Sequence, residues 1–161
     1  MKKLAILMII ITSLFLSGCR NVESYSQSNE ANKILIIIID ALENDDSETI
    51  KELLAPDLLT QSNTIDEEIQ AAFDYFDGNI LSYKNVSTPA GEESYRNGNL
   101  TYSCIGNAVS KSIVTDTGVY KISFSAVLVN EGKKTQEGVW RIWIAKEDED
   151  GVVIGTDNYD L

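Results

Sequence analysis

The apolar residues of this chain change their spacing at Gly78, from the period of a helix to the period of a strand. After Gly78, apolar and polar residues alternate, and turn signals recur between the alternating runs. These signals are Asn97-Gly98, Asp116-Thr117-Gly118, Asn130-Glu131-Gly132 and Asp150-Gly151. The order predicts an α+β fold, in which three N-terminal helices pack on one face of a curved antiparallel sheet of about five strands.

Three helices are expected before Gly78. Residues 30–44 include six consecutive aliphatic residues and could form a buried strand, but the length of the segment favours a helix. Its polar side contains Glu30, Lys33, Asp40 and Asn44, and is interrupted by Ile37. A second, shorter helix is expected to follow the cap residues Asp45-Asp46-Ser47 and to be closed by Pro56. A third is expected to begin at a capping box of Thr64 and Glu67 and to end at Gly78.

Five strands are expected after Gly78, at about 79–95, 99–114, 119–129, 135–146 and 152–156. Pro89-Ala90-Gly91 is expected to break or bulge the first of them. Pairing of Asn130 with Lys134 would set the register of the third and fourth strands. It would form one apolar face, covered by the third helix, from the pairs Phe124–Trp140, Ile122–Ile142 and Tyr120–Ile144.

The other face of these two strands is expected to gather cations around an indole. The same register puts Lys121 opposite Trp143, and Ser123 opposite Arg141. Two interpretations stay open. Lys121, Arg141 and Trp143 are either a cation–π group on an open sheet or a contact surface for an anionic or aromatic group of a ligand or partner.

The N-terminal residues predict export and lipid attachment. A basic start, an apolar stretch from Leu4 to Phe15 and the run Leu16-Ser17-Gly18-Cys19 are typical of a bacterial lipoprotein signal. An uncleaved anchor and an ordinary secretory peptide are the alternatives. We therefore expect residues 1–18 to be a signal peptide, 19–29 to be the acylated Cys19 with a flexible tether, and 30–161 to be a single domain. The expected location is the extracytoplasmic face of a bacterial membrane.

The charge of the chain limits its partners. The 13 basic and 25 acidic side chains give a net charge of −12, and removal of residues 1–18, with Lys2 and Lys3, takes it to −14. Such a surface repels phosphate backbones, so nucleic acid is not an expected partner. Besides the membrane reached through the lipid, a basic protein or a small ligand is the expected partner, unless the charge serves solubility alone.

The reactive side chains exclude several kinds of chemistry. The chain has no histidine, which excludes Ser-His and Cys-His nucleophile pairs, and Cys104 is the only cysteine besides Cys19. Cys104 is expected to be a small buried strand residue. The acidic run 146–151 lacks the spacing of a calcium loop and is expected to be a hairpin turn, so we expect neither a metal nor a cofactor. A catalytic acid or base would have to come from the carboxylates, Tyr83, Tyr102 or Tyr120.

Several short segments resemble a family of bacterial lipoproteins defined by the domain of unknown function 5104. Besides the lipobox and a helix ending near Asp40, they are Asp46-Ser47-Glu48, Phe76-Asp77-Gly78-Asn79-Ile80, Thr115-Asp116, Tyr120-Lys121-Ile122 and Val129-Asn130-Glu131. The resemblance covers about residues 30–157 and implies a cone-shaped fold similar to cystatin and nuclear transport factor 2. It implies no activity.

Two functions from different classes are consistent with these observations. The first is a lipid-anchored extracytoplasmic binding or interaction domain of unknown ligand. The second is a small isomerase- or hydratase-like enzyme that uses a carboxylate in the cone pocket. A carboxylate with a raised pKa inside the cone would favour the enzyme. An open apolar or cationic surface would favour the binding domain.

Overall fold

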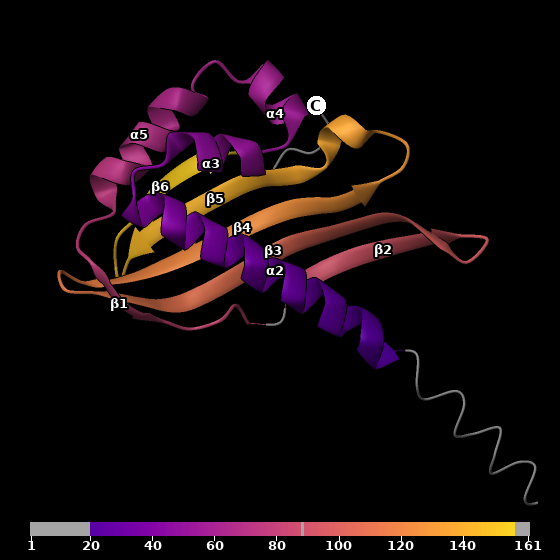
Figure 1. Ribbon diagram of the computed structural model, residues 1–161, viewed down its shortest axis with the longest axis horizontal. Coiled ribbons are helices and arrows are strands. Elements are labelled where there is room, and N and C mark those ends of the chain that lie inside the picture. The colour runs from indigo at the N-terminus through magenta and orange to yellow at the C-terminus, as the bar shows by residue number, and fades with distance from the viewer. Residues whose placement is uncertain (1–19, 88, 157–161) are drawn as a thin grey trace, which may run out of the picture.

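The protein is described by a computed structural model covering residues 20–87 and 89–156, with side chains from Gln27 onward. Helices come first and a six-stranded antiparallel sheet follows, open at both edges (Figure 1). The helices are α2 (Arg20–Glu43), α3 (Ser47–Leu53), α4 (Pro56–Gln61) and α5 (Ile65–Tyr75). The strands are β1 (Ile80–Tyr83), β2 (Ala90–Arg96), β3 (Asn99–Thr115), β4 (Val119–Asn130), β5 (Gly138–Lys146) and β6 (Val152–Gly155). The expected α+β class is confirmed.

The helix α2 is longer than the sequence indicated. It begins at Arg20, so the prediction of a flexible tether is wrong from that residue onward. The segment contains neither glycine nor proline to end a helix, and the Gln27 side chain finds partners in the sheet. Gln27 donates to Glu93 at 3.0 Å and lies 3.4 Å from the Ser103 hydroxyl. A polar composition was therefore compatible with a docked helix.

The segment between α2 and α5 contains two helices where one was expected. Asp46 caps α3 as predicted, because its carboxylate accepts a hydrogen bond from the Thr49 N–H at 3.0 Å. Pro56 does not close this helix but begins α4, where its missing N–H costs nothing. Thr64 precedes α5 as predicted, but its hydroxyl donates to Glu68 at 2.7 Å, so the capping box with Glu67 does not form.

The expected first strand is divided into β1 and β2, close to the predicted break. Both pair with β3, whose 17 residues are long enough for β2 to pair with its first part and β1 with its last part. Asn97 and Gly98 have positive φ angles of 53° and 82°, as a two-residue hairpin turn requires. The sheet order is β1-β3-β4-β5-β6, with β2 also on β3.

The register of β4 and β5 differs from the prediction by two residues. Phe124 lies opposite Ile142 instead of Trp140, and Ser123 lies opposite Trp143 instead of Arg141. The loop before β5 holds a short 3₁₀ turn (Lys134–Gln136), and a bulge between Ser125 and Ala126 adds a further irregularity. Because side chains alternate with a period of two, the slip leaves every residue on its predicted face.

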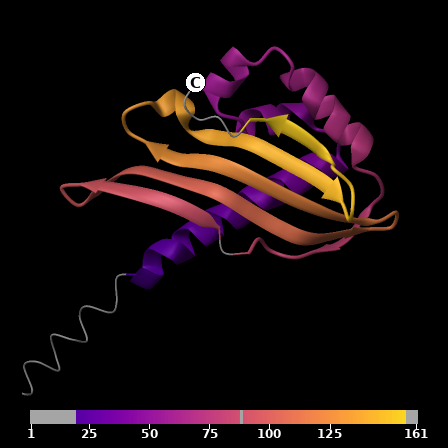
Figure 2. The same cartoon turned by 180° about the vertical axis from the view of Figure 1, so that it is seen from behind.

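One face of the sheet is covered by the helices. Figure 2 shows the other face from behind, with the strands in front of α2. Large apolar side chains fill the space between helices and sheet, each stabilising the fold by about 1.5–3 kcal/mol when fully buried. They include Trp140, Tyr120, Phe124, Leu35, Ile38, Ile50 and Leu58. The interior of the domain is therefore a packed core.

Candidate functional site

The sheet face that carries no helix in the described part of the chain, here called the open face, holds all three residues predicted as a contact surface. Lys121 pairs with Ala145, and Arg141 and Trp143 follow on β5 at alternate positions, opposite Ser125 and Ser123. Lys121 is thus diagonal to Trp143 and not opposite it, which corrects the predicted pair. Lys121, Arg141 and Trp143 are all half-buried. The structure brings them together on one surface of two neighbouring strands.

Trp143 is fixed in place by a turn. Its indole N–H donates to the Asp150 carbonyl at 2.9 Å. Asp150 lies in the acidic turn 147–151 between β5 and β6, which is the hairpin turn that the sequence predicted. The indole is therefore held against this turn at one side of the open face.

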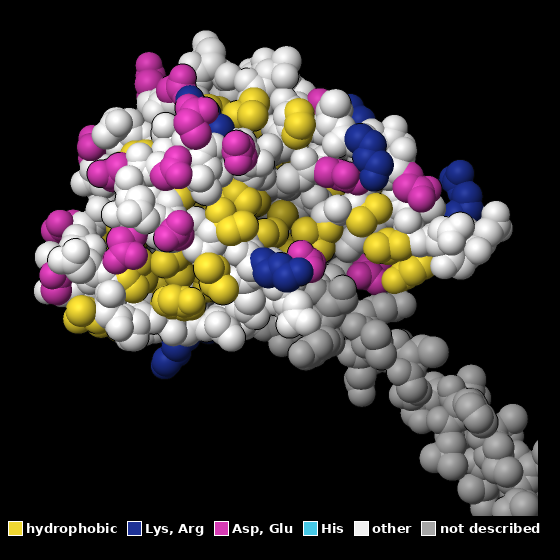
Figure 3. Space-filling view, in the orientation of Figure 1, with side chains coloured by type: hydrophobic (Ala, Val, Ile, Leu, Met, Phe, Trp, Pro, Cys, Tyr) yellow, Lys and Arg dark blue, Asp and Glu magenta, His cyan; other side chains and the backbone are white. Residues whose placement is uncertain are grey.

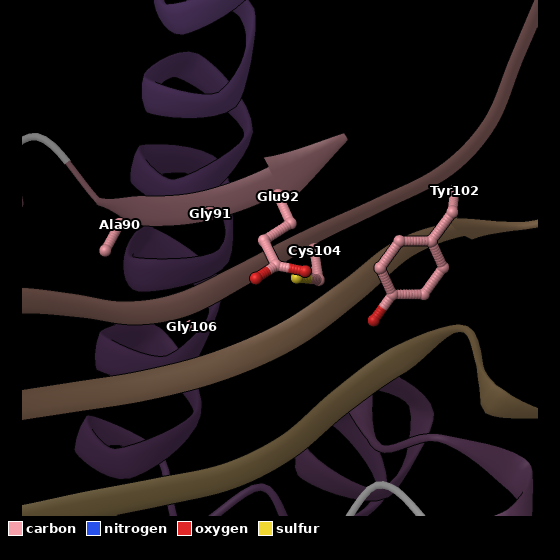
Figure 4. Close-up of a pocket in the computed structure, with 6 residues that line it drawn as sticks. All are labelled: Ala90, Gly91, Glu92, Tyr102, Cys104 and Gly106. Atoms are coloured by element: carbon pink, nitrogen blue, oxygen red, sulfur yellow. The ribbon is translucent and has the colours of Figure 1, made fainter. Parts of the chain in front are cut away.

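A groove lies further along the same sheet, across β2 and β3 (Figure 4). Its volume is about 430 Å³, and its lining is Ala90, Gly91, Glu92, Tyr102, Cys104 and Gly106. Glu93 and Ser103 contact Gln27 of α2, so their neighbours Glu92 and Cys104 point away from the helix. Figure 4 shows the Glu92, Cys104 and Tyr102 side chains in front of the strands and α2 behind them. The groove therefore belongs to the open face.

Gly106 hollows out this groove, whereas the missing Cβ of Gly91 makes room on the side of the sheet that faces α2. A Cβ on Gly91 would lie 2.3 Å from the Cys104 carbonyl oxygen and 2.9 Å from the Gln27 side chain, so only glycine lets β2 approach this closely. Gly106 sits at the bulge between Ile105 and Ala108, where a Cβ would contact only the Ala90 carbonyl, at 3.4 Å. The space above Gly106 is open.

Ser125 connects the groove to Arg141. It pairs with Arg141 on one side, and on the other it lies beside the β3 bulge that contains Gly106, because Phe124 pairs with Ala108 and Ala126 with Ile105. Ser125 is only 2% exposed, and its hydroxyl has no hydrogen-bond partner among the described residues. An unpartnered buried hydroxyl is costly, and the Ser125 oxygen is covered by neighbouring atoms, so another molecule could pair with it only after those atoms move.

Cys104 differs from the prediction of a small buried residue. It is half-buried and lines the groove opposite Glu92. Of the three tyrosines proposed as acids or bases, Tyr102 alone lies in this groove. Tyr120 is fully buried in the core, and Tyr83 lies on the edge strand β1.

Carboxyl groups with shifted pKa values lie outside the groove. Hydrogen bonds from Thr49, Lys133 and Asn79 lower the pKa values of Asp46, Asp57 and Asp116 respectively. Asp46 caps a helix, Asp57 forms an ion pair with Lys133, and Asp116 lies in a turn. Within residues 20–87 and 89–156, no cluster of metal-ligating side chains is present, and no helix is long and apolar enough to cross a membrane.

A cluster of Tyr75, Lys146 and Glu149 at the C-terminal end of β5 stabilises the fold. The Tyr75 hydroxyl donates to Glu149 at 2.7 Å and accepts from the Lys146 N–H at 2.9 Å. Burial, followed by the hydrogen bond to Glu149, raises the pKa of Tyr75. The Lys146 ammonium lies 5.8 Å from the Tyr75 ring and 5.3 Å from the Tyr120 ring. These contacts join α5 to the sheet.

Glu92, Gly106 and Ser125 were missed by the sequence reasoning. Two glycines within otherwise strand-like segments were the available signal, because they mark a bulge or a close backbone approach. The predicted residues Cys19 and 1–18 lie outside the described part of the chain.

Comparison with known protein families identifies a match over most of the domain. A model described as "Domain of unknown function (DUF5104)" matches residues 37–147, a range that contains the groove and the residues Lys121, Arg141 and Trp143. No curated protein matches the chain.

Proposed function

Because the chain belongs to the DUF5104 family, whose domain has no known function, we propose a function from its own residues. It is a lipid-anchored extracytoplasmic domain that binds a ligand or partner on the open face of its sheet. The order of helices before a bent antiparallel sheet also supports a relationship in shape to cystatin and nuclear transport factor 2. Such a relationship carries no activity by itself.

The lipid anchor is supported by the residues that precede α2. Leu16-Ser17-Gly18-Cys19 follows a basic start and a short apolar stretch, and Arg20 begins the first described helix. Acylation of Cys19 by two or more chains would give stable attachment to a membrane.

We expect Cys19→Ser to abolish acylation and to leave the chain unprocessed, because the lipid-bearing thiol is missing. The serine hydroxyl cannot replace the thiol that takes the lipid, and the unprocessed chain should keep residues 1–18. Mass spectrometry of the membrane and soluble fractions measures both effects. Unmodified Cys19 in mature, membrane-bound protein would contradict the proposal.

The binding surface is supported above all by Lys121, Arg141 and Trp143, which lie close together on β4 and β5 of the open face. In a chain with 25 acidic side chains, Lys121 and Arg141 are a local gathering of positive charge beside an indole. Glu92 and Tyr102 add hydrogen-bonding groups at the far end of the groove. The combination suits a ligand that has an anionic or aromatic group at one end and a hydrogen-bond donor at the other.

Anilinonaphthalenesulfonate, an anionic aromatic probe, tests this surface. We expect Arg141→Ala/Trp143→Ala to weaken its binding to the folded protein by about tenfold, which corresponds to roughly 1.4 kcal/mol. A matched pair, Tyr83→Ala/Lys84→Ala on the edge of the sheet, removes the same kinds of side chain elsewhere and should leave binding within about twofold. Fluorescence titration measures both. Equal losses in the two variants would show that the open face is not the site.

The acidic surface supports a basic protein as the partner in the envelope. Attraction across such an interface should weaken as salt is raised, because exposed charges are screened. Nucleic acid is not proposed as a partner, because the acidic surface repels phosphate backbones.

The enzyme alternative has less support. An isomerase- or hydratase-like reaction would need a carboxylate in the cone, yet Trp140, Tyr120 and Phe124 occupy that space. Across the described residues, every carboxyl group with a shifted pKa has it lowered, which is the opposite of what a general acid in an apolar pocket shows.

A further inference from the structure

The side of α2 that faces away from the sheet exposes two large apolar residues. Ile36 is 47% exposed and Ile37 is 38% exposed. Lys33 and Asp40 lie one turn away on either side, because residues three and four apart share a helix face. Figure 3 shows apolar side chains at the surface of this side of the molecule, between a basic side chain and several acidic ones. Ile37 is the residue that interrupts the polar side of the helix in the sequence.

Six exposed residues of α2 form a stripe that has the same spacing from either end, and the exposed Glu43 lies at the margin of this stripe. From the N-terminal end they are Asn29, Lys33, Ile36, Ile37, Asp40 and Asn44, separated by four, three, one, three and four positions. The midpoint lies between Ile36 and Ile37. In an antiparallel pair with a two-fold axis at that midpoint, each isoleucine lies opposite the other isoleucine of the second copy, the lysine lies opposite the aspartate, and Asn29 lies opposite Asn44.

We propose that α2 pairs with α2 of a second copy of this chain, antiparallel and centred between Ile36 and Ile37. In this arrangement each isoleucine pair packs on its symmetry mate, and Lys33 of each copy faces Asp40 of the other. Asn29 faces Asn44. Along the stripe, apolar residues face apolar residues and the basic residue faces the acidic one, which is the self-complementarity that a two-fold interface requires.

Contacts within one chain engage part of this stripe at the surface. Asn44 donates to the Asp40 carbonyl at 2.8 Å and lies 3.4 Å from the Asp40 carboxylate. Lys33 lies 2.6 Å from Glu30, but both side chains are at the surface, where such pairs contribute little. Glu30 faces Glu43 of the other copy in this register, and each already has a partner in its own chain, Lys33 and the Ile80 N–H respectively. The remaining acidic surface disfavours an anionic membrane as the occupant. One helix per copy makes a small interface, so the pairing is weak and best detected by cross-linking.

Disulfide cross-linking of the full-length chain tests the pairing. In a Cys19→Ser/Cys104→Ser background, which removes both native thiols, we expect oxidised Ile37→Cys to form at least about fivefold more covalent dimer than Glu48→Cys, an exposed control on α3. The background alone should give no dimer. An Ile37→Cys yield equal to that of Glu48→Cys would overturn the proposal.

Mixed chains test the antiparallel register. We expect Asn29→Cys and Asn44→Cys to cross-link with each other when mixed. Neither should cross-link with itself, because the two copies of residue 29 would be about 22 Å apart along the helix axis. Self-linking of Asn29→Cys would indicate a parallel pair and would overturn the model.

A charge reversal separates recognition from a chance apolar contact. Lys33→Asp places two aspartates opposite each other and should lower the Ile37→Cys dimer about fivefold. Lys33→Asp/Asp40→Lys restores opposite charges across the axis and should return the yield to within about twofold of the starting level. Circular dichroism should be the same for all variants, since both positions are exposed. Failure of the double reversal to restore dimer would refute the pairing.

Discussion

Trp140→Ala is expected to lower the free energy of unfolding by about 3–5 kcal/mol, whereas Trp143→Ala should cost about 1 kcal/mol. The two tryptophans are three positions apart on β5 and therefore occupy opposite faces of the sheet. Trp140 is fully buried, and its indole N–H donates to the Gln136 carbonyl at 2.8 Å. Its removal leaves a cavity in the middle of the core and an unpaired carbonyl at the turn before the strand.

Trp143 is half-buried on the open face and donates to Asp150. Its removal loses one hydrogen bond and partial burial, with no cavity in the core. Denaturant unfolding followed by far-ultraviolet circular dichroism gives both free energies, and each variant serves as the control for the other. Equal losses would mean that the assignment of the two sheet faces is wrong.

Gly138→Ala is expected to destabilise the fold by about 2–4 kcal/mol. Gly138 begins β5 with a φ of +132°, and a Cβ there would lie 2.7 Å from the Ala55 nitrogen and 2.8 Å from the Ala55 Cα. These are backbone atoms, which cannot swing aside. The strand and the start of α4 would have to separate, breaking the bond from the Ala55 N–H to the Val139 carbonyl at 3.0 Å.

Gly132→Ala in the same loop is the matched control. A Cβ there would meet only the Asn130 side-chain oxygen, at 3.5 Å, which is an ordinary contact. Its effect should stay within about 0.5 kcal/mol. Thermal and denaturant unfolding of the two variants give the comparison. A Gly138→Ala protein as stable as Gly132→Ala would contradict the close approach of the two backbones.

The fold class could be predicted because the hydrophobic period changes once, at Gly78, and local turn chemistry marks each hairpin. The faces of β4 and β5 could also be predicted, although the pairs themselves could not. A shift of two residues leaves the alternation of apolar and polar residues along a strand unchanged, so the faces stay the same. The cross-strand pairs depend on the 3₁₀ turn before β5 and on the bulge at Ser125, and neither is visible in the spacing of apolar residues.

The candidate site was only partly accessible from sequence. Lys121, Arg141 and Trp143 stand out by residue type on one strand pair. Glu92 and Cys104 meet only because β2 joins β3 in a register interrupted by bulges, which is a long-range property. The segment after Cys19 was misjudged because its contacts with Glu93 and Ser103 come from residues more than 60 positions away.

The early start of α2 bears on how the protein would sit on a membrane. The 24 residues of this helix span about 36 Å, and Gln27 ties it to the sheet from near its beginning. If Cys19 carries the lipid as proposed, little slack chain separates the bilayer from the domain. The domain would then have a restricted orientation and a restricted height relative to the membrane plane. Ligands would have to come to it at that fixed height, and lengthening the junction after Arg20 with glycines would widen its search volume without altering the binding face.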